Sequence, residues 1–301
     1  MEFIISAVTD KGIVKNVNQD GLFVSKAKTE SGNIAFAVMC DGMGGLADGE
    51  IASSSVVVAF KNWFKSEIKN LSAAEIEDEK IAAQWMSVVK NINSKIKSYA
   101  EKKNCRAGST VTVILLSKDR YYIMNIGDTR AYLVKNKVTQ LTVDHTLVER
   151  QIRLGNITRE QADVSSMRSV ITRCVGVTEE VYPDFFFGSI SSNAVYLLCT
   201  DGFRHKVTEQ DIAEELGVCI QEKNFQIGQK LKKLVELNKE RKENDNISAL
   251  AIISKEEPEE EVLEDDDDGA TIQLFDIDEE ELEEDCCVEE QIIYIHSDTI
   301  L

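Results

Sequence analysis

The chain has 301 residues, which is enough for one large domain or two small ones. Its formal charge of −19 is unevenly spread: the residues up to Lys255 hold all 34 lysines and arginines with 32 of the 53 acids, and the residues from Glu256 onward hold the other 21 acids and no base. Because no segment is strongly basic, the composition argues against nucleic acid as the main partner.

Sequence periodicity predicts groups of strands and helices over the first 254 residues. The expected strands are residues 3–8, 21–26, 33–40, 110–116, 120–126, 130–134, 170–175, 185–187, 193–200 and 246–254. The expected helices are residues 47–68, 73–102, 147–154, 208–216 and 224–238. Most strands follow one another without a helix between them, which disfavours a parallel doubly wound sheet. We expect an α+β fold in which helix pairs cover sheets.

Composition changes after Ser254. Residues 255–290 are acidic, contain one of the two prolines and few aromatic residues, and are predicted to be disordered. The tail, residues 255–301, is then a solvating polyanion, or its acids at 256–268 act on the protein's own active site. Thr271, in the apolar stretch 269–275, is a candidate phosphorylated docking site. The apolar run Ile292–Ile295 could add a strand to the sheet edge of a partner.

The cysteines and the apolar runs bear on the compartment. The seven cysteines are odd in number and form no Cys-x-x-Cys, which indicates a reducing cytosol. Residues 1–6 lack the pattern of a signal peptide, and no run of about 18 apolar residues exists. We therefore expect a cytoplasmic monomer without a membrane partner.

Five short acidic signatures each follow an apolar run, where a strand would end. They are Asn18-Gln19-Asp20, Asp41-Gly42-Met43-Gly44-Gly45, Gly127-Asp128-Thr129-Arg130, Asp201-Gly202 and Asp245-Asn246. A single Asp-Gly pair is most simply a turn. Five such signatures at rigid strand ends, with few histidines, instead predict a convergent carboxylate site for hard divalent cations.

The signatures, in this order, resemble the motifs of the bacterial metal-dependent protein phosphatases, the PPM or 2C-type family. Further matching motifs are Thr9 to Gly12, Glu50 to Ser53, Gly108-Ser109-Thr110, Asn125 to Tyr132, Leu141 to Thr146, Ile171-Thr172-Arg173 and Leu198 to Gly202. The resemblance covers residues 3–254. It implies one catalytic domain over residues 1–254, folded as an α-β-β-α sandwich of two antiparallel sheets flanked by helix pairs, with metals at one end.

The resemblance also implies a ligand set for two Mg²⁺ or Mn²⁺ ions. Asp41 would bridge the ions, the Gly42 carbonyl would bind one of them, and Asp201 and Asp245 would bind the other.

Two further aspartates resemble residues around this pair of ions. Asp20 would hold metal-bound water from a second shell, and Asp128, with Asp201, would form a third metal site. Asp41, Asp201, Asp245 and Asp20 are then the catalytic residues. The implied reaction is in-line attack of metal-activated water on phosphorus without a covalent enzyme intermediate.

Two positions depart from the family pattern. Lys15 stands where the family usually has an arginine that grips the substrate phosphate, so charge is kept but the bidentate fork is lost. Alternatively, Lys15 is only a surface charge. Met43 stands where some members have a histidine as general acid, so the leaving group would take its proton from water. His145 and His205 are predicted to be structural or loop residues near the site.

Residues 146–169 resemble the flap subdomain of bacterial members, which predicts that they shape substrate choice. The resemblance implies a protein serine/threonine phosphatase that acts on phosphorylated proteins in signal transduction and reverses a cognate Ser/Thr kinase. Two alternatives remain: a phosphatase dedicated to one phosphoprotein of a partner-switching circuit, and a pseudophosphatase that binds phosphoproteins without turnover. The tail could also dock a partner.

Overall fold

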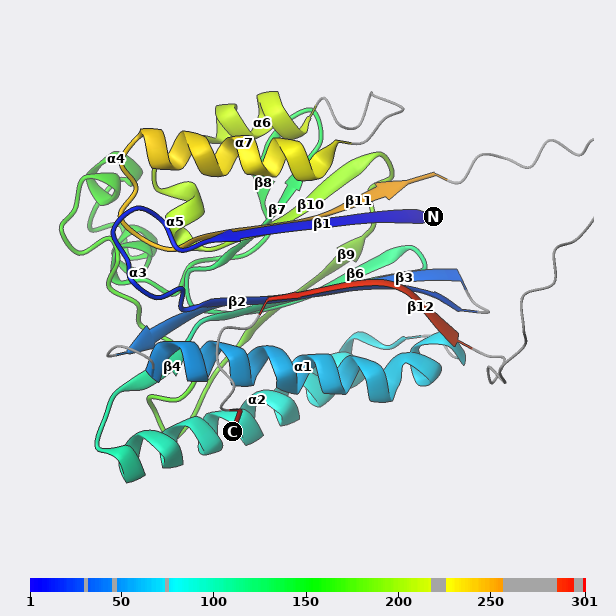
Figure 1. The fold of residues 1–301 in the computed structure, drawn as a ribbon, viewed down its shortest axis with the longest axis horizontal. Coiled ribbons are helices and arrows are strands. Elements are labelled where there is room, and N and C mark those ends of the chain that lie inside the picture. The colour runs from blue at the N-terminus through cyan, green and yellow to red at the C-terminus, as the bar shows by residue number, and fades with distance from the viewer. Residues whose placement is uncertain (30–31, 45–47, 74–75, 218–225, 257–285, 295–299) are drawn as a thin grey trace, which may run out of the picture.

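Two antiparallel sheets lie face to face, and a pair of helices covers the outer face of each (Figure 1). The computed structural model describes all residues except 30–31, 45–47, 74–75, 218–225, 257–285 and 295–299. Within the described residues, the four layers confirm the α+β sandwich that the resemblance implies.

The lower sheet in Figure 1 has seven strands, in the order β12-β2-β3-β5-β6-β9 with β4 paired to β3. Its strands are β2 (Asp20–Thr29), β3 (Gly32–Gly44), β4 (Ala107–Ser109), β5 (Val111–Ser117), β6 (Arg120–Ile126), β9 (Asp184–Ser189) and β12 (Cys286–Tyr294).

The upper sheet has five strands in the order β1-β11-β10-β7-β8. They are β1 (Glu2–Asp10), β7 (Arg130–Val134), β8 (Val138–Gln140), β10 (Ala194–Cys199) and β11 (Ile247–Lys255).

The outer helices are long and the remaining helices are short. Helices α1 (Asp48–Ala73) and α2 (Asp78–Lys103) cover the seven-stranded sheet, and α6 (Glu209–Leu216) and α7 (Ile227–Glu240) cover the five-stranded one. Three short helices, α3 (Leu147–Arg153), α4 (Arg159–Asp163) and α5 (Asp201–Arg204), gather at one end of the sandwich (Figure 1). No helix among the described residues combines the length and the apolar character that crossing a membrane requires.

The sequence of β3 shows why the layers form. Phe36 and Val38 belong to the core beneath α1 and α2, whereas Ala35 and Ala37 belong to the core between the sheets. Successive side chains of a strand point to opposite faces, so a strand buried on both faces reads as a continuous apolar run. Phe36 stacks on Phe64 of α1 with ring centroids 4.7 Å apart, which fixes the helix on the sheet.

Both sheets direct the acidic signatures to the same end of the molecule. In the seven-stranded sheet β2 begins at Asp20, and β3 runs past Asp41 to Gly44. In the five-stranded sheet β10 ends just before Asp201, and β11 begins just after Asp245. Asp41 and Asp201 therefore stand at strand ends as expected, whereas Asp20 and Asp245 stand where a strand begins, and for these two the expectation was wrong.

The short elements β4, β8, α4 and α5 were not predicted from the sequence, and two predicted regions take another form. Residues 170–175 form no strand; Ile171 and Val175 make only isolated bridges, to Thr146 and Ser109. Residues 286–294, expected to be partly disordered and then to pair with a partner's sheet, form β12 on the edge of this chain's own β2. A free edge of β2 would leave backbone N–H and C=O groups without partners, and β12 supplies them. The acidic residues 257–285, including Thr271, lie outside the described residues.

Candidate active site

Four aspartates converge at the end of the sandwich from both sheets. The β2–β3 register places Asp20 directly opposite Asp41. Asp201, at the start of α5, and Asp245, just before β11, approach from the other sheet, close enough for their charges to act on Asp20 and Asp41. The structure therefore brings together residues that are 225 positions apart in sequence.

Burial and mutual repulsion raise the pKa values of Asp20 and Asp41. Burial, with the charges of Asp201 and Asp245, raises the pKa of Asp20 to about 7, although a hydrogen bond from Thr200 Oγ1 to Asp20 Oδ2 (3.1 Å) opposes the shift. Burial is also the main cause that raises the pKa of Asp41 well above its usual value, with further contributions from the surrounding aspartates. Part of the Asp41 residue nonetheless reaches solvent. A concentration of negative charge of this kind favours a cation.

Asp128 joins the cluster from the loop after β6. Burial and the charge of Asp201 raise its pKa to about 6, and the charge of Arg204 opposes this. Arg204 donates to the main-chain oxygen of Asp128 at 3.0 Å and lies 3.3 Å from its Oδ2. Within the described part of the chain, the buried Asp128 Oδ1 and Asp201 Oδ1 accept no hydrogen bond. A buried carboxylate oxygen without a donor is costly, so both oxygens are suited to a ligand.

Glycine is required where the backbone segments that carry these aspartates meet. A Cβ on Gly42 would lie 2.2 Å from the Gly49 oxygen and 2.6 Å from the Gln19 oxygen. A Cβ on Gly202 would lie 2.0 Å from the oxygen of Asn246. The close approach of β3 to the start of α1, and of α5 to the start of β11, therefore depends on the glycine that follows each aspartate.

Hydrogen bonds from the motif side chains fix the loops around the cluster. Asn246 Oδ1 accepts from the Gln19 N–H at 2.9 Å, and its Nδ2 donates to the oxygens of Lys11 and Val17, each at 3.0 Å. The Asp41 N–H donates to Thr110 Oγ1 at 2.8 Å. The asparagine of Asp-Asn and the threonine of Gly-Ser-Thr thus position Asp20 and Asp41 rather than face a substrate.

Lys15 lies at the rim of the cluster, in the loop between β1 and β2. Its Nζ is 2.6 Å from Asp245 Oδ1, and both side chains are about two-fifths exposed (41% and 39%). Burial alone would lower the pKa of Lys15, but the hydrogen bond to Asp245 and the charges of Asp245, Asp41 and Asp201 outweigh it and raise the pKa. Lys15 is therefore a cation at the mouth of an acidic site.

The donor chemistry of the cluster fits divalent cations. Among the described residues no three acidic, histidine or cysteine side chains are already gathered closely enough to coordinate one ion. The fit rests on the donor set, which is almost entirely oxygen and so suits Mg²⁺ or Mn²⁺. It rests also on the two buried carboxylate oxygens without donors. Cations among these aspartates would offset the repulsion that raises their pKa values.

The two histidines near the site contact residues around the cluster. His145 is buried; it accepts from the Gly127 N–H at Nδ1 (3.1 Å), and its Nε2 lies 3.1 Å from Asp184 Oδ2. His205 Nε2 lies 3.5 Å from Asp201 Oδ2. His145 thus supports the loop before Asp128, whereas His205 borders the cluster directly. Met43 pairs with Gly108 in the short β3–β4 ladder.

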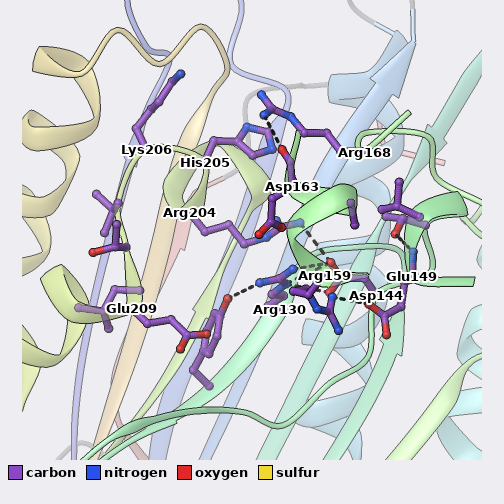
Figure 2. A pocket seen from close by; sticks show the side chains of 17 residues that line it. Arg130, Asp144, Glu149, Arg159, Asp163, Arg168, Arg204, His205, Lys206 and Glu209 are labelled. Atoms are coloured by element: carbon purple, nitrogen blue, oxygen red, sulfur yellow. Dashed lines mark hydrogen bonds and ion pairs between the residues drawn. The ribbon is translucent and has the colours of Figure 1, made fainter. Parts of the chain in front are cut away.

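A cavity of about 320 Å³ adjoins the aspartates and shares Arg204 and His205 with their surroundings. Its walls come from the segment 146–168 and from α5 and α6, and Figure 2 shows their side chains. Arg130 and Arg204 both lie against the buried Asp144, at 2.8 and 3.6 Å (Figure 2). Asp41, Asp20 and Asp245 do not line this cavity. It is therefore a neighbour of the aspartate cluster and not its centre.

Arg204 and Thr200 were not singled out from the sequence. Both flank Asp201, and Arg204 follows it by three residues on the same short helix, so helical spacing could have marked it as a neighbour. Thr200 lies one residue before Asp201, and its bond to Asp20 joins the two sheets. No spacing signal marks that contact, because it links residues 180 positions apart.

Comparisons with known proteins agree with this geometry. The family described as protein phosphatase 2C matches residues 13–236. The serine/threonine phosphatase stp of Listeria innocua is 32% identical over 214 residues, which are 69% of this chain and 81% of that protein. A Streptococcus agalactiae serine/threonine phosphatase shares the fold, with a TM-score of 0.72 and 24% identity over 84% of this chain and all of its own.

One similar structure holds metal. The catalytic domain of the serine/threonine protein phosphatase PstP, solved in complex with two manganese ions, matches with a TM-score of 0.66 and 28% identity over 84% of this chain and 99% of its own. The family match, the relatives and the fold together show that the chain belongs to the protein phosphatase 2C family and is a serine/threonine phosphatase of the bacterial type.

Proposed function

We propose that the chain hydrolyses phosphoserine and phosphothreonine in proteins with water activated by two, or three, divalent cations, and that it thereby reverses a Ser/Thr kinase in the cytoplasm. The convergence of Asp20, Asp41, Asp201 and Asp245, with burial and mutual charge raising the pKa values of Asp20 and Asp41, supports the proposal most directly. The two manganese ions of the PstP catalytic domain favour Mn²⁺ or Mg²⁺ as the cofactor.

The ligand assignment follows the position of each residue in the cluster. Asp41 and the Gly42 carbonyl, at the end of β3, would hold one ion, and Asp201 and Asp245 would share Asp41 in holding the other. Asp128, whose charge acts on Asp201 and whose Oδ1 is without a donor, would serve a third ion with Asp201. When bound, such cations supply a nucleophile from water and positive charge for the phosphate oxygens.

The chain's own side chains would bind and orient the substrate around that centre. Lys15, already a cation at the rim, would bind the phosphate of the substrate. Asp20, held by Thr200, would accept hydrogen bonds from water and fix its direction. No cysteine or serine nucleophile is required: Cys40, the cysteine next to Asp41, is buried, and burial raises its pKa well above the usual value.

Segment 146–169 would select among phosphoproteins. It forms α3 and α4, and it contributes Thr146, Glu149, Arg159 and Arg168 to the walls of the cavity beside the aspartates. Several of its apolar side chains are exposed, including Val164 at 85%. We expect that replacing it with the corresponding segment of a relative changes the ranking of phosphopeptide substrates. An unchanged ranking would contradict this role.

The test of catalysis is hydrolysis of p-nitrophenyl phosphate and of a phosphothreonine peptide with Mn²⁺, Mg²⁺ or EDTA. We expect turnover that needs metal and that falls by at least about a hundredfold in Asp201→Asn, since even residues that only support metal ligands contribute 10- to 100-fold. The matched control is Asp119→Asn, an exposed position in the β5–β6 turn.

A folded wild-type chain without turnover under any metal would reject the hydrolase and favour the pseudophosphatase. Turnover of p-nitrophenyl phosphate but not of generic phosphothreonine peptides would instead favour a phosphatase dedicated to one phosphoprotein. Equal activity of Asp201→Asn and the wild type would reject the ligand assignment while leaving the family unaffected.

A further inference from the structure

The segment after the acidic stretch returns to the body of the protein at two places. Strand β12 pairs antiparallel with β2 at the edge of the seven-stranded sheet (Figure 1). Ile300 and Leu301 then lie between α1 and α2. The two places are on the sheet edge and on the helix layer that covers the same sheet.

The strand contact follows the ordinary rules of a sheet edge. The register runs from Cys286 opposite Thr29 to Tyr294 opposite Leu22, with a shift between Val288 and Glu290. Ile292 packs against the core between the sheets, whereas Ile293 packs against the core beneath the helices. Two adjacent apolar side chains of β12 therefore pack against the cores on the two faces of the sheet.

The helix contact combines an apolar groove with two polar anchors. Between the helices Ile300 and Leu301 border a cavity of about 340 Å³, whose other walls are Ser55, Val58, Ala59 and Asn62 of α1 and Ser87, Val88, Asn91, Ile92 and Lys95 of α2. The Leu301 N–H donates to Ser55 Oγ at 3.1 Å, and Lys95 Nζ donates to the Leu301 oxygen at 3.2 Å. The main chain at Leu301 is therefore held from both helices.

The body does not need this segment for its fold. Among the described residues, the buried members of the three cores include none from 286–301; Ile292, Ile293 and Leu301 only pack against them. Tyr294 and Ile300 each remain 38% exposed. The S. agalactiae structure matches this chain over all of its own length and over 84% of this chain. That share is no longer than residues 1–255. Elements with few buried contacts open at low free energy.

We propose that the edge of β2 and the groove between α1 and α2 form a peptide-docking surface, which residues 286–294 and 300–301 of the same chain occupy. An added strand gains affinity from main-chain hydrogen bonds and specificity from pockets for alternate side chains. The ligand that fits is an extended segment with two adjacent apolar residues and a further apolar pair seven residues on.

The length of the connection makes the chain's own segment the preferred occupant. The 30 residues from Glu256 to Asp285 join Lys255, the end of β11, to Cys286, the start of β12. A connection of this length holds a ligand at an effective concentration on the order of millimolar. A free peptide, or the same segment of a second copy, must compete with that concentration.

The experiment measures binding of a fluorescein-labelled peptide of residues 284–301 by anisotropy. The wild-type chain is compared with the full chain carrying Ile293→Asp and Leu301→Asp, which releases the segment, and with residues 1–255. We expect both released forms to bind the peptide at least tenfold more tightly than the wild type. In the wild type, an internal segment at about 1 mM effective concentration and about 100 μM affinity would raise the apparent Kd of the free peptide about tenfold. A peptide with the same two aspartates is the negative control.

A matched pair of surface variants locates the binding. In the released chain, Lys95→Ala should weaken the peptide several-fold, and Lys90→Ala, an exposed position on the same helix, should not. Turnover of p-nitrophenyl phosphate serves as the check that each chain is folded and should be unchanged. Folded released chains that fail to bind the peptide, or a wild type that binds equally well, would overturn the proposal. A wild-type dimer that grows with concentration, beside a monomeric released chain, would overturn occupancy in cis and place a second copy there.

Discussion

Lys15 is predicted to stand where the family usually has an arginine. An arginine there could hold a phosphate through two parallel N–H groups, whereas the ammonium of Lys15 offers a single point charge. We expect Lys15→Arg to lower KM for p-nitrophenyl phosphate roughly three- to tenfold, the effect of one additional hydrogen bond. Steady-state kinetics with saturating Mn²⁺ measures this. An unchanged KM in Lys15→Ala would show that the side chain does not contact the phosphate.

Asp144 is the counter-charge of two arginines beside the active site. It receives Arg130 at 2.8 Å and lies 3.6 Å from Arg204, and only 7% of its side chain is exposed. Asp144→Asn would leave both guanidinium groups without a full counter-charge. Breaking a buried pair in this way costs about 3 kcal/mol at the lower end of measured values. We expect the free energy of unfolding in urea at pH 7 to fall by about that amount, with Asp119→Asn as the control.

The loss of stability in Asp144→Asn should also depend on pH. Burial alone would raise the pKa of Asp144, but the hydrogen bond from Arg130 and the charge of Arg204 outweigh it, so the pKa lies below the usual 3.8. A lowered pKa stabilises the fold above pH 3.8 and loses that contribution as the pH falls through the folded value. The difference between wild type and Asp144→Asn should be constant from pH 8 to pH 5 and shrink below pH 3.8. A difference that grows on acidification would contradict the ion-pair account.

Residue by residue, the sequence predicted the aspartates better than their supports. Asp20, Asp41, Asp128, Asp201 and Asp245 stand out because each belongs to a recognisable short motif, and for Asp41, Asp128 and Asp201 an apolar run precedes that motif. Their ligand roles stay predictions. The supporting contacts, such as Thr200 to Asp20, join distant parts of the chain through packing of the two sheets, and no local pattern encodes them.

At the scale of elements, the close approach of β3 to α1 depends on the absence of a Cβ atom at Gly42. A Cβ on Gly42 would collide with two carbonyl oxygens, so Gly42→Ala must separate β3, the loop at Gln19 and the start of α1. We expect at least a tenfold loss of turnover, because misplacement by about 1 Å can cost 100-fold. The control is Gly228→Ala in α7, where the nearest atom is the hydroxyl of Ser6 at 3.0 Å. Full activity in Gly42→Ala would show that the site tolerates that separation.

Helices and strands could be predicted from the periodicity of apolar residues where the periodic pattern was long. The helical spacing of the apolar residues in 73–102 predicted α2. Of these residues, Ile81, Trp85, Val89, Ile92 and Ile96 are buried, and Val88 and Tyr99 are partly buried. The prediction failed at residues 170–175, where a short apolar run found only isolated bridges. Strand β12 was predicted to bind a partner, since an apolar run does not reveal whose sheet edge it joins. The short helices α4 and α5 have too few residues for a periodic signal.

At the scale of the whole molecule, the acidic stretch is attached far from the aspartates. Lys255 pairs with Glu2 and Cys286 pairs with Thr29, whereas Asp245 and Asp20 stand at the opposite ends of those strands. We therefore expect a chain that ends at Lys255 to hydrolyse p-nitrophenyl phosphate within about twofold of the full chain, because no metal residue is lost and the core is complete. A several-fold rise in kcat after truncation would show that the acidic stretch restrains the active site.

The whole fold was predictable because the motifs identify a family, and similar structures of that family share this architecture. Fold class and layers are confirmed by the structure and its neighbours, whereas the position of the metal site stays a prediction. The pairing of β12 with β2 could not be predicted in this way, since β12 lies outside the family match at residues 13–236.

The attachment of β12 to β2 determines what proteolytic cleavage between β11 and β12 would do to the protein. Residues 256–285 contain no lysine or arginine, so trypsin has no site there, whereas a glutamate-specific protease has many. One cut in that stretch ends the covalent continuity of the chain but leaves the strand ladder on β2 and the contacts of Leu301 intact. The cut also removes the effective concentration that the connection supplied, so a segment of about 100 μM affinity would separate from the body on dilution below that concentration.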